Sequence, residues 1–410
     1  MVTKDNIVLC DLCFSQISEK THSCTNCDSI QNHKKWQMSL PEGTVVADKY
    51  IIGKVLYNDG SYFCYCGYDR ENEKKVLIKE LFPGGGYCRR EGKNLVLGSS
   101  DEFVKAFYRD MLNDFHKEVK RMSEFKTEEG ISRVRRGFDE NGTSYCVFSF
   151  PQSGMLLSEY LEKNGGHLTM PEALRITEGV IRALDVIHTK GYVHGNIRPE
   201  NIIIYGKKVA LTGFNCGMCK YIVNPSEVLC TDANVYAPVE MFKKSGCTKP
   251  CDDIYALGTT LYHMLTGKFL PDAGTRLGTS GNPAETIKFD YADAATVKLR
   301  TIIAKMTAPK SEGRHKNLDS LCADLKQAKL LNIKLKRDNK AELNKKAKGG
   351  KKLWIIAAIA VLLLAGLITF FALHSCSDNG DEDEKTEKKP REEVVVAEEI
   401  SFSLSELTLF

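Results

Sequence analysis

The middle of the chain contains two kinds of hydrophobic pattern. Residues 50–81 alternate apolar and polar positions around turn residues, which predicts β-strands. Residues 171–191 and 252–267 repeat apolar positions every three or four residues, which predicts helices. Because strands come first and helices follow, we expect an α+β fold of two lobes within residues 44–333.

A third pattern lies near the C-terminus. Residues 353–373 read LWIIAAIAVLLLAGLITFFAL without one charged side chain, and as a helix they would be roughly 30 Å long. Core helices seldom run this long without a polar side, so we expect one transmembrane helix rather than a buried helix. A signal peptide is not expected, because the first ten residues contain no long apolar run.

The two flanks of this segment carry opposite charge. Residues 334–352, a basic juxtamembrane linker, contain nine Lys and Arg against two acidic side chains, whereas residues 374–410 contain eleven acidic against four basic. Basic flanks stay on the cytoplasmic side, which predicts a single-pass protein of the cell membrane with its N-terminal domains in the cytoplasm and its C-terminus outside.

The acidic extracytoplasmic tail ends in EEISFSLSELTLF. Its alternation is similar to the opening strand of a bacterial immunoglobulin-like domain, which the chain ends too soon to complete. A frayed tail and a truncated immunoglobulin-like start both stay open.

The composition of the chain limits which class of protein it can belong to. The 410 residues are 42% hydrophobic and 27% charged, which suffices to bury a core and excludes wholesale disorder. The net charge is only +4, so charge alone gives no reason to expect nucleic-acid binding. Fourteen of the fifteen cysteines precede the apolar segment, on the side that the topology makes reducing, so we expect thiols or metal ligands rather than disulfides.

Four of these cysteines form two CxxC pairs. Cys10 and Cys13 are separated by ten residues from Cys24 and Cys27, in a polar segment too short to bury a core. Four thiolates at this spacing can close a tetrahedron around one ion, which predicts a structural zinc ribbon in residues 1–40. The sequence does not tell what the ribbon contacts, and nucleic acid is not the expected partner.

A second cysteine group lies further along the chain. Cys216 and Cys219, taken with Cys247 and Cys251, are open to interpretation as another metal site or a redox pair. Separate reduced thiols are the preferred interpretation, because the stretch between the two pairs carries structural signals of its own.

Short motifs follow one another along the middle region in a fixed order. They are VLIK ending at Lys79, Glu118 in DFHKEV, HGNIRPEN at 194–201, TGFN at 212–215, APVE at 237–240, and Asp253 in DDIYALG. With this order, residues 44–333 resemble the protein kinases, most closely the bacterial serine/threonine type that follows a zinc ribbon and precedes a membrane span. The resemblance implies a two-lobed protein-kinase-like fold in which Lys79 pairs with Glu118.

The same resemblance identifies missing catalytic groups. The kinase catalytic loop needs an aspartate to accept the substrate proton, and here the position is Asn196, an amide without useful basicity. The aspartate that holds magnesium is replaced by Gly213, so that Asn201 alone remains of the two metal ligands. The resemblance therefore implies a pseudokinase with impaired phosphoryl transfer.

Further departures concern nucleotide binding. The loop that approaches the phosphates is rich in glycine in kinases, but here it reads LYNDGSYFCY and keeps Gly60, with Tyr57, Asp59 and Tyr62 at glycine positions. Pro151 falls where kinases donate a backbone N–H to the adenine ring, and proline has none. We therefore expect weak or absent binding of ATP and magnesium.

Other matched positions are interpreted as structural. For Lys79 and Glu118 an ion pair between two elements is preferred over a working nucleotide clamp. Arg198, at the place of the catalytic-loop lysine or serine, is interpreted as a holder of a phosphate-like group or as a surface charge. The catalytic-loop arginine is Gly195, so a phosphorylated activation segment would find no partner there.

Together these features predict a membrane-anchored pseudokinase that acts as a signalling scaffold or allosteric partner of another protein, with zinc as a structural cofactor. Two alternatives stay open. One is a divergent but active serine/threonine protein kinase that uses ATP, and the other is a membrane-tethered zinc-ribbon nucleic-acid binder.

Overall fold

The architecture was analysed in a computed structural model. It describes residues 2–4, 7–17, 24–27, 36–84, 86–126, 128–214, 235–242, 249–278, 287 and 294–335. The described residues up to Ile333 belong to one compact unit.

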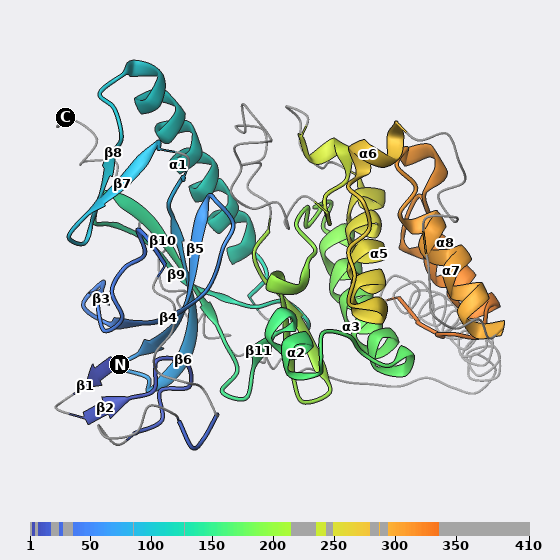
Figure 1. Ribbon diagram of the computed structural model, residues 1–410, viewed down its shortest axis with the longest axis horizontal. Coiled ribbons are helices and arrows are strands. Elements are labelled where there is room, and N and C mark those ends of the chain that lie inside the picture. Colours follow the sequence, from blue (N-terminus) through green and yellow to red (C-terminus); the bar gives the residue numbers. More distant parts are fainter. Residues whose placement is uncertain are drawn as a thin grey trace, which may run out of the picture. The chain divides into compact units, whose positions relative to one another are not determined.

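A small hairpin opens the chain. Strands β1 (Val2–Lys4) and β2 (Ile7–Leu9) pair antiparallel, with Val2 opposite Leu9. The first CxxC pair follows β2 directly, in a tight turn in which the Phe14 N–H donates to the Cys10 carbonyl. Cys10 and Cys13 thus lie directly after the second strand of the hairpin that Figure 1 labels β1 and β2.

The first lobe is built on an antiparallel sheet of six strands in the order β3-β4-β5-β6-β10-β9. The strands are β3 (Val45–Val46), β4 (Tyr50–Asn58), β5 (Tyr62–Asp69), β6 (Lys74–Leu81), β9 (Val134–Glu140) and β10 (Thr143–Ser149). A separate hairpin is formed by β7 (Cys88–Glu91) and β8 (Asn94–Leu97). β-Branched and aromatic residues fill β4 to β6, as strand propensity favours.

Helix α1 (Glu102–Ser123) packs on β9 and β10. It begins at Asp101, whose carboxylate accepts the Phe103 N–H at 2.6 Å and so satisfies a free donor of the first turn. Its buried residues include Met111, Phe115, Glu118 and Met122, which recur every three or four positions. This spacing turns Glu118 toward the sheet.

The second lobe is mainly helical. A three-stranded sheet of β11 (Met155–Leu156), β12 (Ile202–Tyr205) and β13 (Lys208–Leu211) lies beside the helices. The helices are α2 (Leu157–Lys163), α3 (Met170–Thr189), α5 (Pro250–Thr266), α6 (Ala273–Leu277), α7 (Ala294–Met306) and α8 (Leu318–Gln327). Short 3-10 turns are η1 (Pro199–Asn201), η4 (Val239–Phe242) and η6 (Ser311–Gly313).

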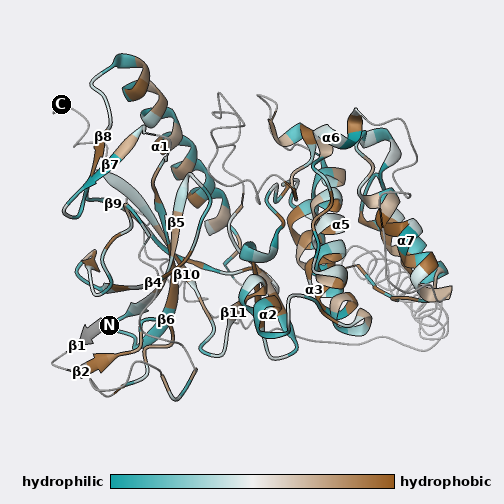
Figure 2. Ribbon diagram, in the orientation of Figure 1, coloured by the Kyte–Doolittle hydropathy of each residue, from teal (hydrophilic) through white to brown (hydrophobic). Residues whose placement is uncertain are grey.

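Apolar packing holds this lobe together. Helix α3 packs on both α5 and β13, and α5 packs on α7. Fourteen residues of α5 are buried, so it is the central helix of the lobe. Figure 2 shows apolar and polar residues on different sides of the outer helix α7, as an amphipathic helix at the surface requires.

The two-lobed α+β fold predicted for residues 44–333 is confirmed. Residues 50–81 form β4 to β6, and the two helical patterns form α3 and α5. The order of strands and helices gives the expected two-lobed α+β fold. None of the described helices is long and apolar enough to cross a membrane. The predicted membrane segment 353–373, most of the basic linker and the tail lie outside the described residues.

Candidate functional site

An ion pair between a strand lysine and a helix glutamate lies at the centre of the site. Lys79 Nζ on β6 is 3.4 Å from Glu118 Oε1 on α1, and each side chain is 3% exposed. The ammonium also lies 3.7 Å from the ring centroid of Tyr62. Lys79 is therefore held between a carboxylate and the aromatic ring that stands at a glycine position of the loop.

Burial limits the ionisation of Glu118. Its second oxygen, Oε2, is buried and has no hydrogen-bond partner in the described part of the chain. Burial raises the pKa of Glu118 to about 7, although the Lys79 ammonium acts in the opposite direction. Near pH 7 the carboxyl is therefore only partly ionised, and the ion pair is incomplete.

A tyrosine hydroxyl crosses from the first lobe to the second. Tyr57 lies near the end of β4, and its hydroxyl donates a hydrogen bond of 3.0 Å to Asn201 Oδ1 in η1. Asn201 Nδ2 in turn donates to the Asn196 carbonyl at 2.9 Å. Asn201 is fully buried, and both ends of its amide are engaged. The oxygen with which a kinase asparagine holds magnesium is here the acceptor for Tyr57.

Gly213 has no room for a side chain. A Cβ at this position would lie 2.3 Å from Asn201 Oδ1 and 2.8 Å from Asn201 Cγ. Its φ of +66° lies in the left-handed region, which glycine adopts at no steric cost. The asparagine thus fills the space that a carboxylate at position 213 would need.

A buried ion pair forms a second connection between the loop of the first lobe and the segment of the second lobe that precedes η1. Arg198 Nη2 lies 3.1 Å from Asp59 Oδ2, and the two side chains are 7% and 11% exposed. Asp59 Oδ1 accepts the backbone N–H groups of Ser61 and Tyr62 at 3.0 and 2.9 Å. Arg198 therefore binds a carboxylate in the loop, and its interpretation as a surface charge was wrong.

Asp253 of α5 holds the loop that carries Asn196. Its Oδ1 accepts the Gly195 N–H at 2.6 Å, and its Oδ2 accepts the His194 N–H at 2.9 Å. Burial lowers the pKa of His194 to about 4, so the ring is neutral at pH 7. The His194 ring packs on Phe214 with centroids 4.6 Å apart. The loop is thus fixed by buried contacts that need no catalytic group.

Gly60 and Pro151 occupy the loop and the hinge. Gly60 has a φ of +82°, and its N–H donates to Asn58 Oδ1 at 2.9 Å. Pro151 lies in the segment after β10, and its carbonyl accepts the Gly154 N–H at 2.8 Å. Both residues therefore sit in turns of the chain, at the two ends of the predicted nucleotide pocket.

The four thiols predicted to bind zinc lie together. The sulfurs of Cys10, Cys13, Cys24 and Cys27 all lie within 4.8 Å of one another. Cys10 Sγ is 3.7 Å from Cys27 Sγ, and Cys13 Sγ is 3.5 Å from Cys24 Sγ. Sulfurs bound to zinc at about 2.3 Å in a tetrahedron are about 3.8 Å apart, so the group fits one zinc ion.

Burial and hydrogen bonds act with different results on two of these thiols. The N–H groups of Leu12 and Cys13 donate to Cys10 Sγ at 3.4 and 3.5 Å, but burial outweighs these bonds and raises the pKa of Cys10. Burial opposes the ionisation of Cys13, but hydrogen bonds from Ser15 and Asn26 outweigh it and lower the pKa of this thiol to about 6. The thiolate is the form that binds zinc.

The CxxC knuckle, defined as residues 10–14, docks on the sheet of the first lobe. Three hydrogen bonds join them: Lys54 N–H to Asp11 O at 2.8 Å, Cys66 Sγ–H to Leu12 O at 2.9 Å, and Gln152 Nε2–H to Cys13 O at 3.3 Å. A Cβ at Gly53 would lie 2.3 Å from Asp11 O, so glycine is required for this close approach. The Phe14 ring stacks on Tyr68 at 5.1 Å.

The register shows which face of the sheet the knuckle covers. Cys64 lies opposite Lys79 in the β5–β6 ladder, so their side chains share a face. Cys66 comes two residues after Cys64 and therefore points to the same face. Because Cys66 and the hinge residue Gln152 both bond to the knuckle, the knuckle covers the hinge end of the face that carries Lys79.

Some of these contacts were not foreseen. The sequence suggested neither the bond from Tyr57 to Asn201 nor the role of Arg314, which is enclosed and pairs with Glu240 at 3.0 Å and Asp252 at 3.2 Å. Glu240 belongs to the APVE motif, which was the only local signal for this pair. Of the second cysteine group, Cys216, Cys219 and Cys247 lie outside the described residues, and Cys251 is a buried thiol.

Comparison with known families agrees with this geometry. The family model of the protein kinase domain matches residues 102–326, more than half of the chain. The chain belongs to the protein kinase family. The match begins at α1, after the strands β4 to β6 that carry the altered loop and Lys79.

The similar curated proteins are serine/threonine kinases, and two of them are bacterial. The chain is 26% identical over 267 residues to the probable serine/threonine-protein kinase PknB of Lactococcus lactis, covering 61% of this chain and 41% of that protein. It is 25% identical over 300 residues to the serine/threonine-protein kinase PrkC of Bacillus subtilis, covering 70% and 41%. The chain thus spans about two fifths of the length of these relatives.

Solved structures share the fold. PpkA-294 in its apo form has a TM-score of 0.56 and 26% identity, covering 70% of this chain and 100% of that chain. A variant of the Mycobacterium tuberculosis PknI kinase domain has a TM-score of 0.50 at 18% identity, covering 71% and 100%, and shows the fold alone.

Replacing Glu118 with Gln tests the buried carboxyl. The pKa of Glu118 is about 7 in the folded chain against an ordinary value of 4.5, so the folded state binds the proton more tightly. The resulting stabilisation is complete below pH 4.5 and is lost as pH rises through 7, by about 3 kcal/mol in all. In urea denaturation, we expect the free energy of unfolding of the natural chain to fall relative to Glu118→Gln between pH 5 and 8.

The exposed Glu162 provides the control. Glu162→Gln should keep the pH dependence of the natural chain. If Glu118→Gln kept it as well, Glu118 would have an ordinary pKa and the ion pair would be complete.

Proposed function

We propose that this protein is a membrane-anchored pseudokinase that acts as a signalling scaffold or allosteric partner of another protein. The observation that carries the proposal is the hydrogen bond from Tyr57 to Asn201 Oδ1. It engages the remaining metal-ligand position of the family with a side chain of the altered loop. In such a domain the loop and Asn201 bond to each other instead of to the phosphates of a nucleotide and magnesium. The kinase fold is then left as a surface to which a partner can bind.

The electrostatics of the loop support the same proposal. Kinases stabilise the transferred phosphoryl group with cations and magnesium, and the aspartate position that would hold the metal is Gly213. Here Arg198 is neutralised by Asp59, a carboxylate that occupies a glycine position of the loop. Asn196 provides no general base. Losses of a base and of a metal ligand each reduce rates by orders of magnitude.

Structural zinc is part of the proposal. Four thiolates would complete the coordination of one zinc ion and leave no position for a reacting ligand. The knuckle covers the hinge end of the lysine-bearing face, beside Pro151. Zinc would therefore stabilise the knuckle and, through Cys66 and Gln152, its contact with the first lobe.

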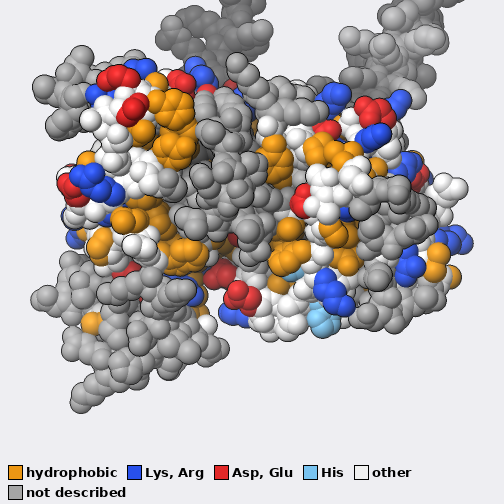
Figure 3. All heavy atoms as spheres, turned by 45° about the horizontal axis from the view of Figure 1, so that its top comes forward, with side chains coloured by type: hydrophobic (Ala, Val, Ile, Leu, Met, Phe, Trp, Pro, Cys, Tyr) orange, Lys and Arg blue, Asp and Glu red, His pale blue; other side chains and the backbone are white. Residues whose placement is uncertain are grey.

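An active serine/threonine kinase is the second candidate. The pairing of Lys79 with Glu118 favours it, and so does the similarity to the bacterial serine/threonine kinases PknB and PrkC. A nucleic-acid binder has less support, because acidic and basic side chains lie intermixed over both lobes on the face drawn in Figure 3.

Titration of ATP with magnesium separates the first two candidates. We expect no heat of binding to the natural chain at millimolar ATP. Tyr57→Gly with Asp59→Gly removes the tyrosine and the carboxylate from the loop, and should raise the affinity at least about tenfold, which is 1.4 kcal/mol. Asn196→Asp with Gly213→Asp should not restore phosphate transfer, because Asn201 fills the space beside position 213.

Tyr57→Phe is the matched control for this titration. It removes the bond to Asn201 but keeps the ring, so it separates the hydroxyl from the bulk of the side chain. Micromolar ATP binding by the natural chain, or radiolabelled phosphate transfer by it, would contradict the pseudokinase and favour the active enzyme.

Zinc is tested by metal analysis and thiol labelling. We expect one zinc per chain, and we expect its removal by a chelator to expose Cys66, whose thiol is now fully buried under the knuckle. Cys146, fully buried in β10, is the internal control and should stay protected. A chain without zinc would contradict the metal site, and unchanged protection of Cys66 after zinc loss would contradict the docking.

The orientation in the membrane is tested with a variant that retains only Cys376. With the basic flank inside, a membrane-impermeant maleimide should label this thiol on intact cells. Labelling only after lysis would place the C-terminus in the cytoplasm.

A further inference from the structure

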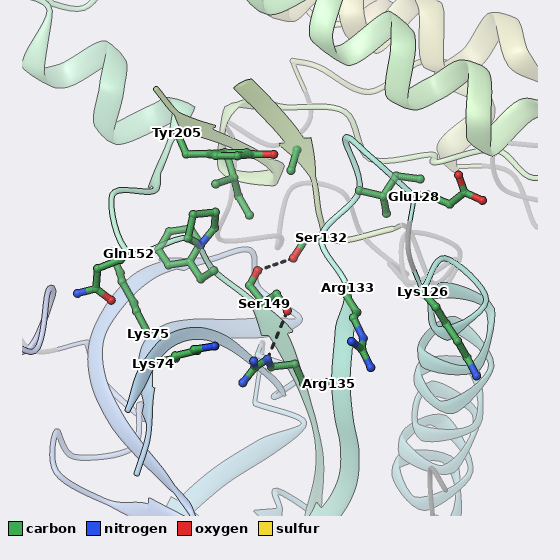
Figure 4. Close-up of a pocket in the computed structure, with 15 residues that line it drawn as sticks. Lys74, Lys75, Lys126, Glu128, Ser132, Arg133, Arg135, Ser149, Gln152 and Tyr205 are labelled. Atoms are coloured by element: carbon green, nitrogen blue, oxygen red, sulfur yellow. Dashed lines mark hydrogen bonds between the residues drawn. The ribbon is translucent and has the colours of Figure 1, made fainter. Parts of the chain in front are cut away.

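A cavity lies beside the hinge on the compact unit. Its volume is about 510 Å³, within the usual range for ligand sites. It is bounded by hinge residues 149–152, the start of β6, the segment before β9, and strands β12 and β13. Figure 4 shows the residues that line it. Of the candidate site residues, Pro151 lines the cavity, and Lys79, Glu118, Asn201 and Gly60 do not.

The cavity wall carries five basic side chains and one acidic side chain, Glu128. Two of the basic groups are already engaged. Lys75 Nζ donates to the Gly154 carbonyl at 3.2 Å, and Arg135 Nη1 pairs with Asp69 at 3.1 Å. These two contacts hold the wall in place.

The other three basic groups are available. Lys74, Lys126 and Arg133 are exposed, and no ion pair joins them to any residue in the described ranges. They come from three different segments: the start of β6, the stretch after α1, and the stretch before β9. Figure 4 shows their side chains spread along one side of the cavity, with Lys126 well apart from Lys74. Charges arranged in a row fit an extended polyanion better than one compact anion.

The floor of the cavity is apolar. Ile131, Phe150, Ile203 and Ala210 line it, together with the half-buried Tyr205. Ser132 Oγ donates to the Ser149 carbonyl at 2.7 Å, which ties the segment before β9 to the hinge. An apolar floor with a cationic edge suits a chain that carries both an apolar side chain and carboxylates.

We propose that this cavity is a docking site for an acidic peptide segment of a protein partner, with one apolar side chain on the floor and carboxylates against Lys74, Arg133 and Lys126. The inference rests on the proposed scaffold function, because it gives that partner a place to bind. The docked peptide would contact the hinge at Pro151 and Gln152, and Gln152 also bonds to the CxxC knuckle. It would therefore contact the segment that joins the two lobes.

Fluorescence anisotropy with the full chain tests the docking site. The probe is a labelled peptide in which one leucine is flanked on both sides by glutamates, and its control has glutamines instead. We expect the acidic peptide to bind, and Lys74→Glu with Arg133→Glu to weaken it at least about tenfold. Binding should also weaken as salt rises.

Lys93→Glu is the matched charge reversal, because Lys93 is exposed on the β7–β8 hairpin and does not line the cavity. It should leave the affinity unchanged. Equal binding of both peptides, equal loss in both variants, or tighter binding of a random oligonucleotide than of the acidic peptide would overturn the docking site. The ATP titration is independent of these outcomes, so failure here is distinguishable from failure of the proposed function.

Discussion

The hydrogen bond between Tyr57 and Asn201 is the contact on which the rest of the site depends. It joins the altered loop of the first lobe to the turn that follows the Asn196 loop, over 144 positions of the chain. With Asn201 held there, a Cβ at Gly213 would overlap its amide. The position of Asn201 therefore accommodates both the tyrosine at position 57 and the glycine in place of an aspartate at position 213. The pair of Asp59 and Arg198 closes the same gap with opposite charges in a buried place, where they interact strongly.

On the hinge side of the molecule, contacts to the backbone of a neighbouring segment take the place of bonds between side chains. There the CxxC knuckle covers the lysine-bearing face through backbone carbonyls, and glycine at position 53 permits the close contact. The knuckle has little apolar core of its own, so the metal and the sheet together would stabilise it. The basic cavity lies beside the same hinge and shares Gln152 with this contact. The four-thiol group, the hinge and the cavity are thus connected through one short segment of chain.

Prediction from the sequence succeeded where the signal is local or periodic. The alternation in residues 50–81, the helical spacing of α3 and α5, and the CxxC pairs each depend on neighbours a few positions apart. It left two interpretations of Arg198 open, a holder of a phosphate-like group and a surface charge, since its partner Asp59 lies 139 positions away. It did not predict that Arg314 would pair with two carboxylates, because they are 62 and 74 positions distant.

The sequence by itself determined the two-lobed kinase fold, the absence of carboxylates at positions 196 and 213, and the grouping of four thiols, because residue identity and spacing suffice for these. Only the tertiary structure decided that Tyr57 takes the Asn201 oxygen, that burial raises the pKa of Glu118, and that the knuckle lies on the Lys79 face. Each of these results depends on which distant groups meet in a region without water, where an unpaired charge is costly and a single atom of extra volume is excluded.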